Sequence, residues 1–310
     1  MKCGIAAALT AFALPAMAQM PDDGFTMGKG ELCTVAAYKQ SQWKEYWEGT
    51  RLRENLNLGT FTSKAFMPML GFGVSDKLNL FASLPYISNS SDKGTMTGKK
   101  GWQDFSMAAK YQLLDITKKK MRYALFATGA FSLPATNYVP DYLPYSIGIG
   151  SKTASLRLIG HVVYKEDFFA TIQGGYSFRS NIDVDRQTYY TDAQHYSNEM
   201  EIPDAWDASV KVGYDNYRIR TNVHYMIMNS TSGSDIRRND MPYPGNKMDM
   251  QAVGVDVLLW IPGVKGLGVT GSADKTIAGR NMGKAFTWMA GAQYVFRPFK
   301  KKKAPEEKTK

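Results

Sequence analysis

Cysteine and histidine are scarce in this chain of 310 residues, which holds two of the former and three of the latter. Cys3 lies in an N-terminal segment that we expect to be cleaved, so Cys33 would remain alone, and a lone cysteine excludes an intramolecular disulfide framework. The histidines, together with one cysteine, match no metal-ligand spacing. A glycine-rich phosphate loop is missing too, since Gly263 and Gly266 have no helical pattern after them. We therefore expect neither a metal centre nor a cofactor.

Long hydrophobic runs are missing as well. The nearest candidate beyond the N-terminus, Ala252 to Val264, contains Asp256 and Pro262. A transmembrane helix needs about 20 mainly apolar residues. Transmembrane helices are therefore not expected.

The first 18 residues have the features of a secretory signal peptide. Lys2 gives a positive start, an apolar run extends from Ile5 to Leu14, and Ala16-Met17-Ala18 forms a small-residue cleavage site. We expect cleavage before Gln19 and export of the mature chain.

The positive charge of the chain is concentrated at its C-terminus. Residues 297–310 hold seven basic residues and two acidic ones, Glu306 and Glu307. Their net charge is therefore half of the net charge of +10 of the whole chain. The basicity therefore belongs to a tail rather than to a binding groove, and an exported protein has little access to nucleic acid. We expect no nucleic-acid partner and interpret residues 297–310 as a basic periplasmic tail.

What the chain does have is tyrosine, glycine and a period-two alternation of apolar and polar residues. In one stretch Tyr217, Ile219, Val223, Tyr225 and Ile227 alternate with Arg218, Arg220, Asn222 and His224. Patterns of this kind predict twelve strands, many of them long enough to cross a bilayer when tilted. They cover residues 43–57, 61–75, 77–88, 102–114, 121–133, 147–164, 168–183, 205–214, 217–230, 249–261, 267–278 and 285–296.

The connections between these strands alternate between short and long. Transmembrane β-barrels have this arrangement, with short periplasmic turns and longer external loops. Unpaired backbone groups are too costly in hydrocarbon, so such a sheet must close on itself. We therefore predict an all-β protein, a single antiparallel barrel of about 12 strands over residues 43–296 in the bacterial outer membrane. Residues 19–42 would form a leader or a plug inside the barrel.

Charged residues on the predicted inward faces are the candidates for solute selection. Rings of Arg and Lys bias a pore towards anions, although opposite charges can also pair and fill the lumen. The candidates are Asp104, Lys110, Arg157, Arg179, Lys211, Arg218, Arg220 and His224. We expect the partners to be outer-membrane lipids and a small-molecule solute that crosses by diffusion.

The last predicted strand, AFTWMAGAQYVF, carries aromatic residues at alternating positions and ends in Phe296. Apolar residues before a terminal aromatic resemble the signal that barrel-assembly machinery recognises. We assign that signal to Trp288, Tyr294 and Phe296, although fourteen residues follow Phe296.

Two alternatives from other classes remain open. His195-Tyr196-Ser197-Asn198 resembles the His-x-Ser-Asn element of outer-membrane phospholipases and lipid A deacylases, in which imidazole activates the hydroxyl. In those enzymes the element is followed by Gly or Ala, whereas this chain has Glu199. The element also falls in a predicted loop. The competing explanation is that the four residues match by chance. The third hypothesis is a structural or adhesive barrel whose loops 184–204 and 231–248 bind an external partner.

One stretch also resembles a known family. A strand ends in Gly73-Val74-Ser75-Asp76, the next closes on Leu84-Pro85-Tyr86, and Leu133-Pro134 follows later. Between them lies an element made of Gly101, Asp104, Lys110 and Tyr111, with Gln103 where a second glycine is usual. Residues 66–135 thereby resemble the outer-membrane transporters named for the meta-pathway of phenol degradation. The resemblance implies a barrel that passes small, often aromatic or apolar, molecules and brings no catalytic residues.

Overall fold

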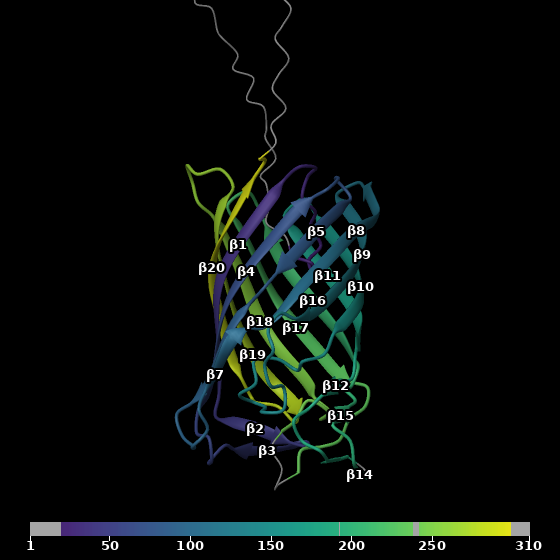
Figure 1. Ribbon diagram of the computed structural model, residues 1–310. Coiled ribbons are helices and arrows are strands. Elements are labelled where there is room, and N and C mark those ends of the chain that lie inside the picture. The colour runs from purple at the N-terminus through teal and green to yellow at the C-terminus, as the bar shows by residue number, and fades with distance from the viewer. Residues whose placement is uncertain (1–19, 192, 238–241, 299–310) are drawn as a thin grey trace, which may run out of the picture.

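The computed structural model describes residues 20–191, 193–237 and 242–298, and these residues form a closed antiparallel barrel (Figure 1). Its wall has twelve positions, two of which are occupied by interrupted strands. The strands are β1 (Leu32–Trp43), β4 (Phe61–Gly73), β5 (Leu78–Ser83) with β6 (Tyr86–Ser91), β7 (Lys99–Trp102) with β8 (Asp104–Lys118), β9 (Met121–Pro134), β10 (Thr153–Tyr164), β11 (Phe168–Arg179), β16 (Ala205–Asp215), β17 (Ile219–Ser230), β18 (Asp249–Trp260), β19 (Leu267–Arg280) and β20 (Phe286–Phe296). The predicted fold class is confirmed.

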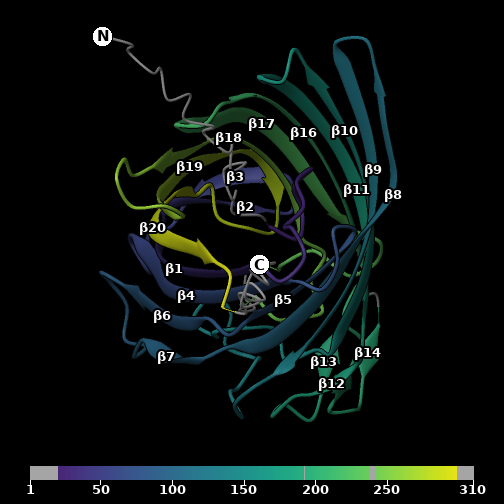
Figure 2. The same ribbon diagram turned by 90° about the horizontal axis from the view of Figure 1, so that it is seen from above.

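The barrel closes between its first and last strands, as the view along its axis shows (Figure 2). β1 pairs with β20 from Leu32↔Phe296 to Gln42↔Phe286, and with β4 on its other side. No edge is left at this seam, which satisfies the backbone hydrogen bonds that a lipid environment cannot.

Proline explains one of the two interruptions. β5 and β6 both pair with β4, and Leu84-Pro85 separates them. Because proline has no backbone N–H to donate to the ladder, the strand breaks there and resumes at Tyr86. β8 then pairs with β5, and β7 with β6.

Successive residues of each strand face alternately outwards and into the barrel. Along β10, Leu156 and Leu158 are 65% and 58% exposed on the outer face, whereas Ile159 and His161 on the inner face are buried. The outer face is apolar over the other strands too, with aromatic residues such as Tyr164, Phe168 and Trp206 exposed on it. This is the surface that lipid contact requires.

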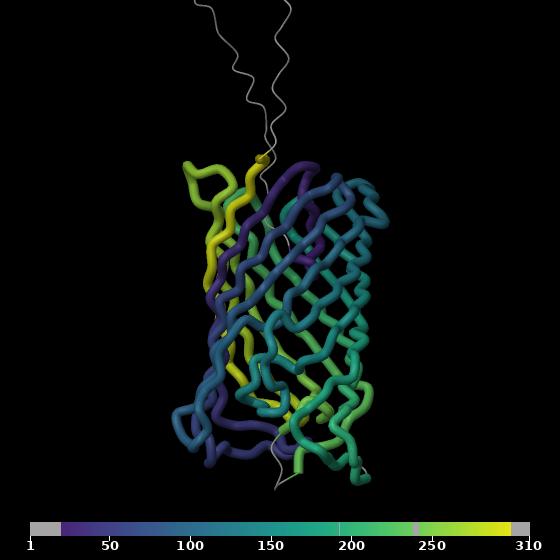
Figure 3. The backbone as a smooth tube through the Cα atoms, viewed as in Figure 1, coloured from purple at the N-terminus to yellow at the C-terminus, as the bar shows by residue number. Residues whose placement is uncertain are grey.

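The two rims differ, and the backbone trace makes the difference plain (Figure 3). At the terminal rim, where β1 begins and β20 ends, the connections are short turns such as residues 119–120, 165–167 and 216–218. At the opposite, long-loop rim, residues 44–60, 135–152, 180–204 and 231–248 connect the strands.

The long loops are themselves folded. Short strand pairs form within them: β2 (Glu45–Glu48) with β3 (Arg51–Glu54), β12 (Ile182–Asp183) with β15 (Glu199–Met200), and β13 (Tyr189–Tyr190) with β14 (Gln194–His195). A small apolar core joins two of the loops; its buried members are Ile182, Val184, Met200, Ile202 and Tyr243. Residues 135–152 turn inwards, since buried Tyr145 packs on inward-facing Phe61 and Asn89 donates to the carbonyls of residues 144–146.

The predicted first strand is wrong. The barrel begins at Leu32 rather than at residue 43, and residues 45–54 form the β2–β3 hairpin over the long-loop rim. Trp47 in this hairpin is only 7% exposed. The physical reason lies in β1, whose inward residues Cys33, Val35 and Ala37 pack in an apolar cluster with Met27 and Phe81. From Leu32 to Tyr38 both faces of β1 are therefore mainly apolar, and no alternation marks this stretch as a strand.

No helix in the described part of the chain is long and apolar enough to cross a membrane. The predicted signal peptide over residues 1–18 and the tail beyond residue 298 lie outside the described residues and remain predictions.

Candidate functional site

Residues 20–28, here called the N-terminal segment, lie inside the barrel between the terminal rim and its middle. Lys110 on β8 holds this segment through three hydrogen bonds. Its Nζ donates to Asp23 Oδ1 and to the Met20 carbonyl at 2.7 Å each, and to the Asp23 carbonyl at 3.3 Å. The Lys110 side chain has no exposed surface, and its ammonium lies 5.4 Å and 5.8 Å from the ring centroids of Phe81 and Phe126. A lysine this deeply buried requires an anionic partner, and Asp23 is that partner.

A second lysine holds the neighbouring carboxylate. Lys211 on β16 donates to Asp22 Oδ2 at 3.2 Å. Burial by itself would raise the pKa of Asp22, but the charges of Lys211 and Arg157 and the hydrogen bond from Lys211 outweigh it and lower the pKa to about 2. Asp22 still has 40% of its side chain exposed to the lumen, so solvent weakens this pair relative to the Lys110–Asp23 pair.

Phe25 fits into a cage of cationic and aromatic groups. The guanidinium carbon of Arg220 lies 3.4 Å from the centroid of the Phe25 ring, which is a close cation–π contact. His161 and Phe169 meet the same ring edge-on, with centroids 4.9 Å and 5.5 Å away. Arg220 also pairs with Asp215 at 3.2 Å.

Gly24 allows this close approach. A Cβ at position 24 would lie 2.1 Å from the Cγ of His161, nearer than any real contact permits. His161 cannot easily move away, because it is buried and its Nδ1 is hydrogen-bonded to Thr171 Oγ1 at 2.8 Å. Only glycine fits at this point of the segment.

The segment leaves the lumen through contacts with the inner wall near β1. The Met27 N–H donates to Asn79 Oδ1 at 2.9 Å, and Asn79 Nδ2 donates back to the Met27 carbonyl at 3.1 Å. The Met27 side chain is buried in the apolar cluster of Cys33, Val35 and Phe81. At the rim itself, the Gly28 N–H donates to Glu31 Oε2 at 2.8 Å.

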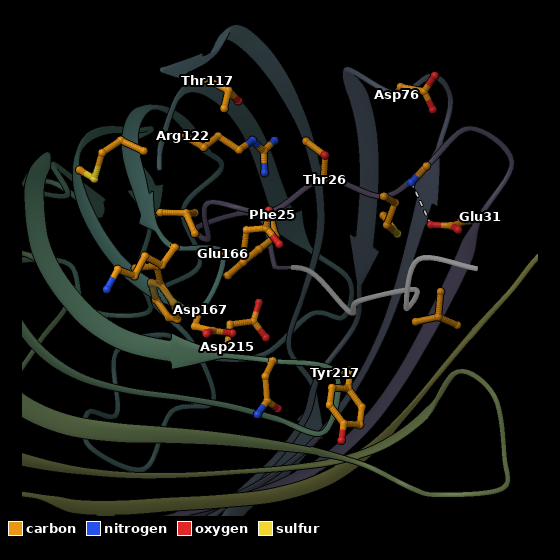
Figure 4. A pocket seen from close by; sticks show the side chains of 18 of the residues that line it. Phe25, Thr26, Glu31, Asp76, Thr117, Arg122, Glu166, Asp167, Asp215 and Tyr217 are labelled. Carbon is orange, nitrogen blue, oxygen red and sulfur yellow. Dashed lines mark hydrogen bonds between the residues drawn. The ribbon is translucent and has the colours of Figure 1, made fainter. Parts of the chain in front are cut away.

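A cavity of about 1540 Å³ opens between the N-terminal segment and the terminal rim. Phe25, Thr26 and Met27 line it on the segment side, Arg122 and Asp215 line it from the barrel wall, and Tyr217 lines it from the turn after β16 (Figure 4). The lining mixes charges of both signs with apolar groups.

Two other predicted lumen residues bind polar side chains of other strands. Arg157 bonds Asp207 at 2.8 Å and Gln173 at 3.1 Å. His224 contacts two carboxylates, Asp274 at 2.8 Å and Asp256 at 3.4 Å.

Nearer the long-loop rim, two predicted lumen residues hold the loops. Asp104 accepts from the hydroxyl of Tyr138 at 2.6 Å. The guanidinium of Arg179 donates to the Pro203 carbonyl at 2.9 Å, and the backbone N–H of Arg179 donates to Asp204 Oδ1. These residues anchor residues 135–152 and 180–204 to the wall.

The structure does not place Arg218 with Arg220. Arg218 lies in the exposed turn before β17, with its guanidinium carbon 5.1 Å from the centroid of the Tyr217 ring, whereas Arg220 is buried in the barrel. The sequence reasoning extended the strand by two residues into the turn.

Three residues of the site, Asp22, Asp23 and Phe25, were not singled out from the sequence. Their partners lie far along the chain, so no local spacing reports the contacts. The available signal was an acidic pair followed by an aromatic residue, just before a barrel whose predicted lumen holds several cations.

The residues of the hydrolase alternative have other partners. His195 Nε2 is hydrogen-bonded to Thr191 Oγ1 at 2.7 Å, and its ring stacks on Tyr189 with centroids 4.7 Å apart. Ser197 Oγ accepts from the Glu199 N–H at 3.0 Å, and the Asn198 carbonyl accepts from the Val184 N–H. All three residues belong to the long loop 180–204, away from the lipid-facing wall.

The residues predicted to signal assembly share the outer face of β20. Trp288 and Tyr294 are exposed there, Trp288 contacts Tyr38 of β1 with ring centroids 5.5 Å apart, and Tyr294 stacks on Phe296 at 5.2 Å. They border the β1–β20 seam; recognition by assembly machinery stays a prediction.

Comparisons with known proteins show the fold. No family model matches the chain, and no curated protein matches it. Among solved structures, it is similar to the COG4313 outer membrane channel from Pseudomonas putida F1, with a TM-score of 0.70 and 15% identity over 89% of this chain and 99% of that one. More distant similarities are to the NanC porin (TM-score 0.46, 8% identity, 85% and 98% covered) and to the translocator domain of the autotransporter NalP from Neisseria meningitidis (TM-score 0.45, 9% identity, 88% and 90% covered). The chain therefore has the fold of an outer-membrane β-barrel.

Proposed function

We propose that this protein is an outer-membrane channel through which a small solute diffuses, and that its N-terminal segment closes the lumen at rest. The observation that carries the proposal is a closed barrel with an apolar outer face and a lumen of charged side chains, two of which hold the segment. A barrel whose role was only structural would need no cavity of about 1540 Å³ leading to such a segment.

Orientation follows from the two rims. In outer-membrane barrels the short turns face the periplasm and the long loops face outwards. The terminal rim would then be periplasmic, with the cavity open to the periplasm. A signal peptide at residues 1–18 would bring the chain to this membrane.

The resemblance of residues 66–135 to the meta-pathway transporter family supports a solute with an aromatic or apolar part. The inner wall near β1 agrees with such a solute, because Val35, Ala37 and Phe81 make it apolar. Lys110 borders this apolar wall, and Arg157 and Lys211 lie farther around the barrel on β10 and β16. A solute with one apolar and one polar side would suit this lumen.

Permeability of liposomes tests the channel without assuming a solute class. Vesicles loaded with dextran would be mixed with an uncharged pentose, and swelling would be followed by light scattering. We expect slow swelling with the wild type and faster swelling with Asp22→Asn/Asp23→Asn, because that variant weakens both lysine contacts of the segment. Asp185→Asn, in an exposed loop, is the matched control.

The proposal is overturned if neither protein adds permeability although both are folded barrels. Folding is checked by gel migration, since a closed barrel that resists detergent migrates differently before and after boiling.

A further inference from the structure

The N-terminal segment presents two kinds of chemistry to the barrel within four residues. The first is anionic: the carboxylates of Asp22 and Asp23 are bound by Lys211 and Lys110. Charge-assisted hydrogen bonds of this type are about twice as strong as neutral ones. With the segment in place the Lys110 ammonium is walled off from solvent. In its absence Lys110 and Lys211 would present two cationic groups to the lumen, which favours an anion there.

The second kind is aromatic. Phe25 is covered by the guanidinium of Arg220 on one side and meets the rings of His161 and Phe169 edge-on. Edge-to-face and cation–π contacts select a flat ring over an aliphatic group of similar volume. This cage lies beside the lysines, since Asp23 and Phe25 are two residues apart.

One polar atom of the cage is not used by the segment. His161 Nε2 is buried and has no hydrogen-bond partner within residues 20–191, 193–237 and 242–298. Leaving a buried polar atom without a partner is energetically unfavourable. A ligand with a hydroxyl group on its ring could donate to His161 Nε2 or accept from it, whichever tautomer His161 adopts, which the phenyl ring of Phe25 cannot do.

We infer that the lumen contains a binding site for aromatic carboxylates and that the N-terminal segment occupies this site as an internal substitute for the solute. Lys110 and Lys211 would bind the carboxylate, and the cage of Arg220, His161 and Phe169 would hold the ring. The inference rests on the proposed channel function and names its solute class. The solute and the segment would exclude each other, because both need the same two lysines and the same cage.

Competition of this kind predicts which changes strengthen ligand binding. The apparent dissociation constant equals the intrinsic one divided by the fraction of molecules whose site is free. Weakening the segment raises that fraction. Asp22→Asn/Asp23→Asn does so by charge, and Gly24→Ala does so by steric clash with His161, with no change in charge.

The experiment is isothermal titration calorimetry of the full chain in detergent with phenylacetate as the probe. Acetate lacks the ring and benzylamine carries the opposite charge, so they test the two halves of the site separately. We expect weak binding of phenylacetate to the wild type and binding at least tenfold tighter to Gly24→Ala and to Asp22→Asn/Asp23→Asn. Adding Lys211→Met to Gly24→Ala is expected to remove about tenfold of the affinity, whereas Lys275→Met, on the lipid-facing side of β19, is expected to leave it unchanged.

Three outcomes would overturn the inference: acetate or benzylamine binding as tightly as phenylacetate, no gain in either segment variant, or no effect of Lys211→Met. Binding in detergent requires no transport, so phenylacetate binding without any liposome permeability would count against the channel alone. Pentose permeability without preference for phenylacetate would count against the aromatic-carboxylate site alone.

Discussion

The contacts of Lys110 and Lys211 allow the stability of the closed lumen to be estimated. Asp22→Asn/Asp23→Asn removes both negative charges of the N-terminal segment and changes little in shape. The Lys110–Asp23 hydrogen bond is 2.7 Å long and its lysine has no exposed surface, so its loss costs about 1.5–3 kcal/mol. The Lys211–Asp22 pair is partly exposed and contributes about 0–1 kcal/mol.

Together the two losses amount to about 1.5–4 kcal/mol, which corresponds to about a 10-fold to 1000-fold change in the release equilibrium of the segment. Asparagine still offers an amide oxygen to each lysine. We therefore expect a value in the lower part of this range, about 30-fold. Met27 stays buried and Phe25 keeps its ring contacts in the variant, so the segment stays bound in most molecules.

Hydrogen exchange of the Met27 amide measures this equilibrium. The Met27 N–H donates to Asn79 in the wild type, and its exchange requires release of the segment from the wall. The exchange rate, followed by mass spectrometry of peptides covering residues 20–31, should rise by the same factor of about 30 when local opening is the exchange route. Strand peptides and the Asp185→Asn variant provide the controls.

The reasoning is refuted if exchange at Met27 changes less than about threefold in the double variant while the barrel stays folded. That result would mean that the two lysines do not hold the segment and that its apolar contacts alone suffice.

Three further predictions concern the same barrel. The pKa of Asp22 in the folded protein is lowered to about 2 from the ordinary value of 3.8, so its contribution to the closed state is complete above about pH 5 and is lost as pH falls towards 2. Met27 exchange, corrected for the intrinsic pH dependence, should therefore rise over that interval. A flat corrected profile from pH 5 to pH 2 would contradict the role of Asp22. Gly24→Ala should increase the exchange rate of the Met27 amide at least tenfold, because the added Cβ clashes with His161. The rate is measured by the same mass-spectrometric method. An unchanged rate would show that the segment does not lie against His161. If Trp288 and Phe296 carry the assembly signal, Trp288→Ala/Phe296→Ala should reduce the yield of heat-modifiable barrel in outer membranes at least several-fold. Leu156→Ala, on the same outer surface, is the control. Equal yields for the two variants would contradict the assignment of the signal to Trp288 and Phe296.

The alternation of apolar and polar residues predicted most strands because most of the wall separates lipid from a charged lumen. In β17, Val223 and Tyr225 are exposed outwards while Arg220 and Asn222 are buried inside, as the pattern indicated. The same logic fails for the first half of β1, because its inner face packs on Met27 and Phe81 and is as apolar as its outer face. A strand between two apolar environments leaves no period-two signal.

The candidate site was predicted only on its barrel side. The inward positions of Lys110, Lys211 and Arg220 follow from strand parity, but their partners depend on contacts across tens of residues. Lys110 pairs with Asp23 at a separation of 87 residues, and Lys211 with Asp22 at a separation of 189. No periodicity connects such distant positions, so the occupant of the lumen became apparent only in the folded structure.

The short connection between Phe25 and Leu32, the first residue of β1, determines how the channel would respond to its solute. A segment joined to the wall by so few residues remains near its site after release, at an effective concentration in the millimolar range for a short flexible linker. A solute must therefore outcompete a permanent local ligand, and opening would have a threshold concentration. At low solute levels the outer membrane would keep its barrier, and permeability would appear only when the solute was abundant.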